Sequence, residues 1–161
     1  MQLQRAGLMF LLSLASGTCA EASPAPPSAL NMAPDVRQLF QAEMRELLMG
    51  TQSIAASLPV GNWESITRSA LTMRDSYVLD KKLTTAQRHA LDRLPEHFKA
   101  LDYAFHVRAE KLADAAKAKD AEVAAFQFSR LLETCVACHS SYATVQFPGL
   151  TSTAREPQHH P

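Results

Sequence analysis

Cys135-Val136-Ala137-Cys138-His139 is the segment of this chain whose residue types and spacing could do chemistry. Two thiols three residues apart, followed directly by an imidazole, form the spacing that attaches a c-type haem. Each thiol can add to one vinyl group of the haem to form a thioether, and the adjacent imidazole can bind the iron as an axial ligand. On a helix Cys135, Cys138 and His139 share one face, so one helical segment could hold the porphyrin against itself.

The same Cys-x-x-Cys spacing also serves thiol redox centres and zinc sites, so its context must separate the three. A redox-active pair is expected at a helix N-terminus that follows a strand, whereas this pair follows a long helical pattern. Zinc needs a fourth ligand, and none stands at a plausible spacing from the two cysteines and His139. Haem attachment is therefore the interpretation that the context favours.

Residues 1–20 have the features of a secretory signal peptide. Arg5 precedes a short apolar run over residues 7–15, and Thr18-Cys19-Ala20 fits a small-x-small cleavage site. The apolar run is too short to span a bilayer. We expect a periplasmic protein with no stable membrane insertion after cleavage; the alternatives are an uncleaved anchor or a lipoprotein acylated on Cys19. Cleavage would leave Cys135 and Cys138 as the remaining cysteines.

The chain of 161 residues is 47% hydrophobic and 20% charged, which suits a single domain with a real core. Its 16 basic and 16 acidic residues balance, so no basic field would attract nucleic acid. We expect a flexible linker over residues 21–34, a folded domain over 35–147 and a loose tail over 148–161. The function we expect involves protein partners rather than nucleic acid.

Apolar residues recur at alternating spacings of three and four through the folded domain, which predicts helices. The expected helices span residues 35–57, 63–77, 85–94, 95–116 and 124–142, with Asp35 capping the first. Residues 59–62 and 117–120 supply the breaks. No segment shows sustained strand alternation. Four long amphipathic helices with short connections predict an all-α, antiparallel four-helix bundle.

The apolar face expected on the first helix includes Met44, which should therefore point into the bundle. The matching face of the last helix includes both Cys135 and Cys138, so the haem should lie between helices, near the end of the last one. His106 neighbours the apolar face of its helix without lying on it. We expect it at the boundary of the core rather than as a second histidine ligand.

With these features the chain resembles the class II c-type cytochromes, the cytochrome c-prime family and its Met-ligated, low-spin relatives. The resemblance rests on Cys135-Val136-Ala137-Cys138-His139-Ser140-Ser141-Tyr142 at the end of the last helix, and on the helices that precede it. It covers residues 35–147. It implies a periplasmic four-helix bundle with covalently attached haem c, redox partner proteins and a possible homodimer. The family often has a basic residue shortly after the ligating histidine, whereas Ala143 follows Tyr142 here.

The resemblance does not specify the second axial ligand of the iron, because members of the family differ at this position. Some members supply a Met from the first helix and transfer electrons, and others leave the site open and bind small gases. Met44 fits the first pattern, while Met49 falls on a more polar face of the same helix. We expect a non-enzymatic monohaem c-type cytochrome that carries one electron, with iron ligands His139 and Met44. The alternative is a five-coordinate protein that binds nitric oxide or carbon monoxide.

Overall fold

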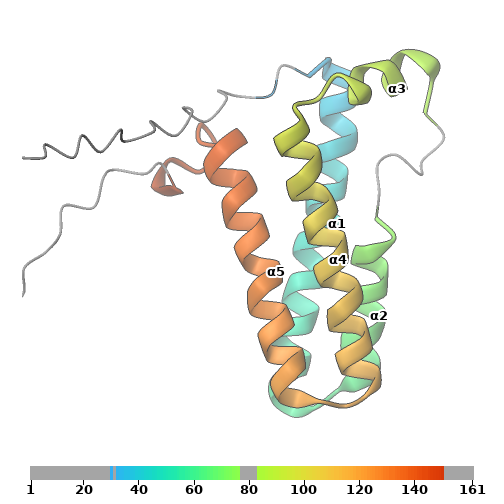
Figure 1. The fold of residues 1–161 in the computed structure, drawn as a ribbon, viewed down its shortest axis with the longest axis vertical. Coiled ribbons are helices and arrows are strands. Elements are labelled where there is room, and N and C mark those ends of the chain that lie inside the picture. The colour runs from blue at the N-terminus through green and yellow to red at the C-terminus, as the bar shows by residue number, and fades with distance from the viewer. Residues whose placement is uncertain (1–29, 31, 77–82, 151–161) are drawn as a thin grey trace, which may run out of the picture.

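In the computed structural model, residues 30, 32–76 and 83–150 are described, and this part of the chain is helical without strands. Four long helices alternate in direction, with one short helix between the second and third of them (Figure 1). In chain order the elements are α1 Pro34–Ser57, η1 Leu58–Val60, α2 Trp63–Arg74, α3 Thr85–Asp92, α4 Glu96–Lys117, α5 Ala121–Tyr142 and η3 Pro148–Leu150. The prediction of an antiparallel helical bundle is confirmed.

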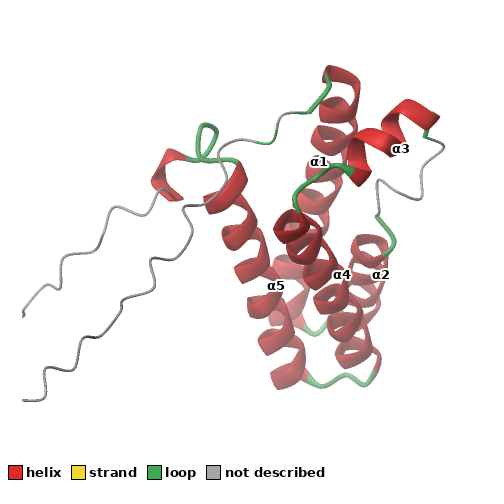
Figure 2. Ribbon diagram, turned by 45° about the horizontal axis from the view of Figure 1, so that its top comes forward, coloured by secondary structure: helices red, strands yellow, loops and turns green. Residues whose placement is uncertain are grey.

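The long helices do not all pack equally against one another. α4 lies along both α2 and α5, and α1 lies along α2, whereas α1 and α5 hardly touch. Figures 1 and 2 both show α5 standing apart from α1 toward its C-terminal end. This separation on one side of the bundle is the feature of the fold that matters most for the functional site.

The helix boundaries follow from local chemistry that the sequence makes visible. Gly61 adopts a φ of 64°, which a side chain would disfavour, and Asn62 then caps α2 by accepting a hydrogen bond from the Ser65 amide. Thr84 forms a capping box with Gln87 at the start of α3, and Asp120 caps α5. The breaks predicted over residues 59–62 and 117–120 therefore fall where expected.

The predicted cap of the first helix is wrong. α1 begins at Pro34, and its N-cap residue, Ala33, makes no side-chain capping bond. Proline is favoured at this position because its missing N–H would have no helical partner. Asp35 instead lies in the first turn, where its carboxylate accepts a hydrogen bond from the Gln87 side chain at 3.0 Å and ties α1 to α3.

The register of α1 also differs from the prediction that Met44 points into the bundle. Val36, Glu43, Ile54 and Ser57 are the buried residues of α1, and Glu43 is only 2% exposed. Met44 is 41% exposed and lies at the edge of this buried face. Val36 and Glu43 are seven residues apart and Ser57 follows Glu43 by fourteen, so these three share one face of α1, and the position after Glu43, Met44, lies to the side of that face.

The core runs through the middle of the bundle and includes the residues that set the position of α5. Small residues on α4, among them Ala109 and Ala113, allow close packing of the neighbouring helices. Leu131 on α5 is completely buried in this cluster, and Cys135 packs against it one turn later. The first thiol of the motif is therefore held by the core itself. Parts of the other domain predictions lie outside the described residues: the signal peptide over residues 1–20, residues 21–29 and 31 of the linker, and residues 151–161 of the tail. Tyr77, the expected end of the second helix, also lies outside them.

Candidate functional site

α5 presents two adjacent faces, and the motif straddles them. The core face carries Leu131, Cys135, Cys138 and Tyr142, which recur at spacings of three and four. Both thiols are partly buried, as expected from the sequence. His139 follows Leu132 by seven residues, so it lies on the neighbouring face, turned toward the side where α5 stands apart from α1. The helix thus directs the thiols inward and the imidazole toward that opening.

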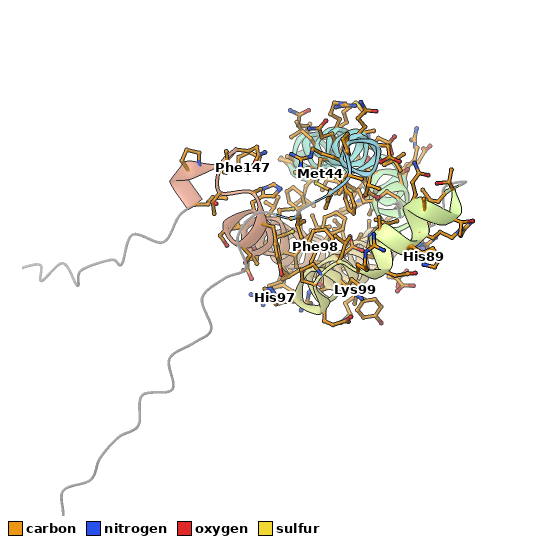
Figure 3. The ribbon with its side chains drawn as sticks, turned by 90° about the horizontal axis from the view of Figure 1, so that it is seen from above. Met44, His89, His97, Phe98, Lys99 and Phe147 are labelled. Atoms are coloured by element: carbon orange, nitrogen blue, oxygen red, sulfur yellow. The ribbon has the colours of Figure 1, made fainter. Side chains whose placement is uncertain are left out.

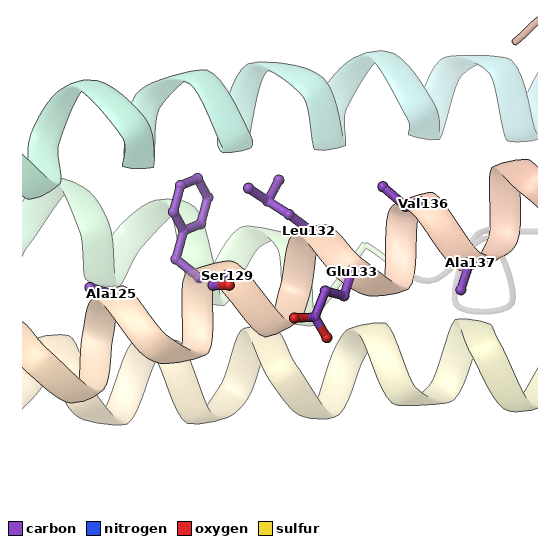
Figure 4. A pocket seen from close by; sticks show the side chains of 7 residues that line it. Ala125, Ser129, Leu132, Glu133, Val136 and Ala137 are labelled. Atoms are coloured by element: carbon purple, nitrogen blue, oxygen red, sulfur yellow. The ribbon is translucent and has the colours of Figure 1, made fainter. Parts of the chain in front are cut away.

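A shallow apolar groove of about 530 Å³ runs along this second face of α5. Figure 4 shows Leu132 and Val136 pointing from α5 toward the ribbon of α1. The lining consists of Ala125, Phe128, Ser129, Leu132, Glu133, Val136 and Ala137. The volume lies within the range usual for cofactor sites, and the polar contribution to the lining is small. Large apolar side chains left open to solvent in this way call for a partner surface or a bound group.

One side of α1 is also apolar and exposed. Met44 and Leu48 lie one turn apart on this side, and both are exposed. The opposite side of α1 is marked by Ser53, whose hydroxyl is hydrogen-bonded to those of Ser65 and Ser69 on α2. All the residues that line the groove belong to α5, and Met44 with Leu48 forms a separate exposed apolar face on α1.

Met44 and Met49 lie on different sides of α1. Five residues turn an α-helix by about 140° beyond one full turn, so the two side chains leave α1 in different directions. Met49 is well exposed and lies on a different side of α1 from Met44. Of the two methionines considered, only Met44 therefore shares the exposed apolar face of α1 with Leu48.

The two thiols are free and have the character of unreactive, buried groups. Burial raises the pKa of Cys135, and burial together with the negative charges of Asp102 and Cys135 raises the pKa of Cys138 to about 11. Redox-active Cys-x-x-Cys pairs have the opposite property, because a lowered pKa supplies their thiolate. The electrostatics of this site therefore speak against a thiol redox centre.

The imidazole of His139 is in a protonation state suited to binding a metal. Partial burial lowers its pKa, so the ring is neutral at neutral pH, as a metal ligand must be. The phenyl ring of Phe147 stacks on it, with the ring centroids 4.4 Å apart and the planes 19° from parallel. Within the described ranges, no group of three or more His, Cys, Asp and Glu side chains is arranged to hold a bare metal ion. A zinc site at the motif gains no support.

A family model described as Cytochrome C' matches residues 42–143, which is well over half of the chain. This chain belongs to the cytochrome c′ family. Proteins of this family bind haem c through covalent attachment, and haem c is therefore the cofactor of this chain. Cytochrome c′ proteins are typically periplasmic haem proteins that carry electrons or bind gases, and they are often dimeric. No curated protein and no solved structure matches the chain.

The residues of this cytochrome fit the cofactor by the chemistry of their donors and by shape. Two thiols stand on α5 at the spacing that thioether formation needs, a neutral imidazole follows, and an apolar groove extends beside them. Haem supplies an iron centre that changes its charge by one electron and can bind a diatomic gas. The protein supplies attachment, axial donors and exclusion of water from the porphyrin faces.

An aromatic cluster at the open end of the bundle holds the last turn of α5 in place. Tyr142 is buried, its hydroxyl is hydrogen-bonded to His97 Nδ1 at 3.0 Å, and its ring meets Phe98 edge to face. Phe98 in turn meets Phe40 of α1 edge to face, and Figure 3 shows Phe98 near the middle of this end of the bundle. The hydrogen bond between Tyr142 and His97 could not be predicted from the sequence, because only the packing of α4 against α5 brings the two residues together.

His106 is away from the groove, and its predicted boundary position is wrong. The side chain is buried, and Nδ1 donates to the backbone carbonyls of Met73 and Arg74 at the C-terminus of α2. A histidine at this place donates to carbonyls of the last turn of α2, where the regular hydrogen bonds of a helix end. Its Nε2 lies 3.7 Å from Asp102 Oδ1. The sequence pattern missed this role because the end of α2 comes near His106 only in the folded bundle.

Proposed function

We propose that this protein is a periplasmic monohaem cytochrome that carries one electron at a time between redox partner proteins. In this proposal Cys135 and Cys138 form the two thioethers, His139 is the proximal ligand and Met44 is the distal ligand. The observation that carries it is the position of Met44 on an exposed apolar face of α1 with Leu48, on the opposite side of this helix from the serine contact with α2. A signal peptide over residues 1–20 would account for export.

Thioether ligation is well suited to electron transfer. A soft sulfur ligand favours ferrous iron, raises the reduction potential and closes the position that a gas would occupy. With both axial positions filled, electron exchange would require little change at the iron. The apolar side chains of the groove, including Leu132 and Val136, would keep water from the porphyrin and so favour a stable potential.

The alternative is a five-coordinate protein that binds nitric oxide or carbon monoxide. Leu48 supports it, since this exposed apolar side chain lies one turn from Met44 on the same face of α1 and could cover an open iron site. The two functions make opposite demands on Met44. In the first it binds iron, whereas in the second it only packs beside the porphyrin.

Substitution of the two methionines separates these functions. In the holoprotein, Met44→Ala should convert a low-spin reduced spectrum into a high-spin one and allow rapid carbon monoxide binding. Met49→Ala is the matched control, because it removes the same side chain from the other side of α1 and should leave both properties unchanged. His139→Ala should abolish the low-spin spectrum while mass spectrometry still finds covalent haem.

Two results would overturn the proposed electron carrier. The first is an unaltered protein that is already high-spin when reduced and binds carbon monoxide readily, which would establish the gas-binding alternative. The second is a low-spin spectrum that Met44→Ala does not change, which would require a different sixth ligand. A low-spin spectrum that survives His139→Ala would remove His139 from the site.

A further inference from the structure

The segment that follows α5 folds back toward His139, which lies in the last turn of this helix. The Ala143 amide donates to the His139 carbonyl at 3.0 Å, and the Phe147 amide donates to the Ala143 carbonyl at 2.9 Å. The short helix η3 follows, and its residue Leu150 donates to the Phe147 carbonyl at 3.0 Å. Backbone hydrogen bonds on both sides therefore fix Phe147 at a defined position relative to His139.

This position places one aromatic ring flat on another. The stack between Phe147 and His139, 4.4 Å between centroids and 19° between planes, covers one face of the imidazole. Rotation of the imidazole about its bond to Cβ would drive its edge into the phenyl ring. The contact therefore restrains the torsion about the Cβ–Cγ bond, which helps to set the direction of the imidazole plane.

A hydrogen bond that would restrain this torsion is lacking among the residues that the structure describes. A histidine that binds a metal usually donates its second N–H to a carboxylate or carbonyl, and this bond orients the ring. Among the residues that the structure describes, the imidazole of His139 makes no such hydrogen bond, and its ring contact is with Phe147. The aromatic stack stands where a hydrogen bond would ordinarily be found.

We propose that Phe147 is a positioning residue for the proximal ligand, which fixes the plane of the His139 imidazole by stacking on it. The inference rests on the proposed function, since it takes His139 as the iron ligand. Phe147 touches the ligand and not the iron, so its substitution should leave haem attachment intact and alter the orientation of the bound ring. The plane of an axial imidazole determines how unpaired spin spreads over the porphyrin, which makes the orientation measurable.

The test uses the oxidised holoprotein and the NMR resonances of the haem methyl groups, whose order and spacing report the imidazole plane. Phe147→Leu keeps an apolar side chain but loses the flat aromatic face, and it should change the order or spacing of these resonances. Phe147→Ala should change them in the same sense. Phe147→Tyr restores an aromatic face and should return the pattern of the unaltered protein.

Val145→Ala is the matched control, because Val145 lies in the same segment and is 80% exposed. It should leave the methyl resonances unchanged. Methyl patterns in Phe147→Leu and Phe147→Ala that match the unaltered protein would overturn the positioning role. An equal change in Phe147→Tyr or Val145→Ala would also overturn it, because the effect would then belong to the segment and not to the stack.

The failure of the proposed function has a separate signature. His139→Ala in the same experiments shows whether His139 binds the iron at all. If its spectrum matches that of the unaltered protein, the ligand assignment is wrong, and the role of Phe147 is overturned with it. If His139→Ala loses the spectrum while the Phe147 variants keep the methyl pattern, only the positioning role is wrong.

Discussion

Leu131 and Leu132 are neighbours in sequence but should have different roles, and replacing each with alanine tests the register of α5. Leu131 is 0% exposed and belongs to the core, whereas Leu132 is 38% exposed and lines the groove. Leu131→Ala removes three buried carbon atoms, which costs about 2.4 kcal/mol at ~0.8 kcal/mol for each. The cavity left behind adds to this, so we expect a loss of about 3 kcal/mol. For a domain of this size that lowers Tm by about 12 °C.

The assay is urea unfolding of the holoprotein followed by far-ultraviolet circular dichroism, together with the visible spectrum and the reduction potential. Leu131→Ala should lose the stability stated and keep the haem spectrum of the unaltered protein. Leu132→Ala should instead change the spectrum or the potential, since it would open space beside the porphyrin. The reasoning is refuted if Leu131→Ala costs less than about 1 kcal/mol, or if it perturbs the haem more than Leu132→Ala does.

Two further predictions concern the α1–α2 contact and the thiols. A Cβ on Gly50 would lie 3.0 Å from Met73 Cγ and Sδ. Gly50→Ala should therefore lower the free energy of unfolding in urea by about 1 kcal/mol, despite the better helix propensity of alanine. With Met73→Ala in the same chain this cost should vanish, and a cost that persists would contradict the steric explanation. In protein made without haem, the folded chain raises the Cys138 pKa from 9.0 to about 11, so at pH 8 it holds about a hundredth of the thiolate that the unfolded chain holds. Alkylation of Cys138 by iodoacetamide should therefore be about 100-fold slower in the folded protein than in urea. Equal rates would refute the burial of this thiol. Because folding raises the pKa of Cys138, the contribution of this thiol to the free energy of unfolding is complete below pH 9.0. It is lost as the pH rises toward 11.

The helices themselves were largely predictable, because their boundaries depend on local chemistry. Gly61 and Asn62 separate α1 from α2, and Thr84 with Gln87 begins α3, all within a few residues along the chain. The start of α1 was predicted wrongly, since Asp35 has the right side chain for a cap but Pro34 begins the helix before it. The carboxylate of Asp35 binds Gln87, which is remote in sequence.

In the candidate site, too, the features that depend on local spacing could be predicted, whereas contacts between segments remote in sequence could not. Cys135, Cys138 and His139 could be predicted because their spacing is a local property of one helix. The contact of Phe147 with His139 depends on a turn of several residues whose path no periodic pattern specifies. The influence of Asp102 on the pKa of Cys138 depends on the packing of α4 against α5. Contacts of this kind need the tertiary structure.

Met44 shows why an apolar pattern is an incomplete guide to a cofactor site. A helix that borders both a core and a cofactor carries apolar residues over a wide arc, and the periodicity of that arc does not say where the core ends. On α1 the core includes Glu43, a residue that a hydrophobic pattern would leave out, and Met44 lies just beyond it. The exposure of Met44 and Leu48 in the folded chain distinguishes the two parts of the arc. A residue that is apolar, regularly spaced and yet exposed is therefore a stronger candidate ligand than one buried in the core, because only the exposed side chain is free to contact a bound group.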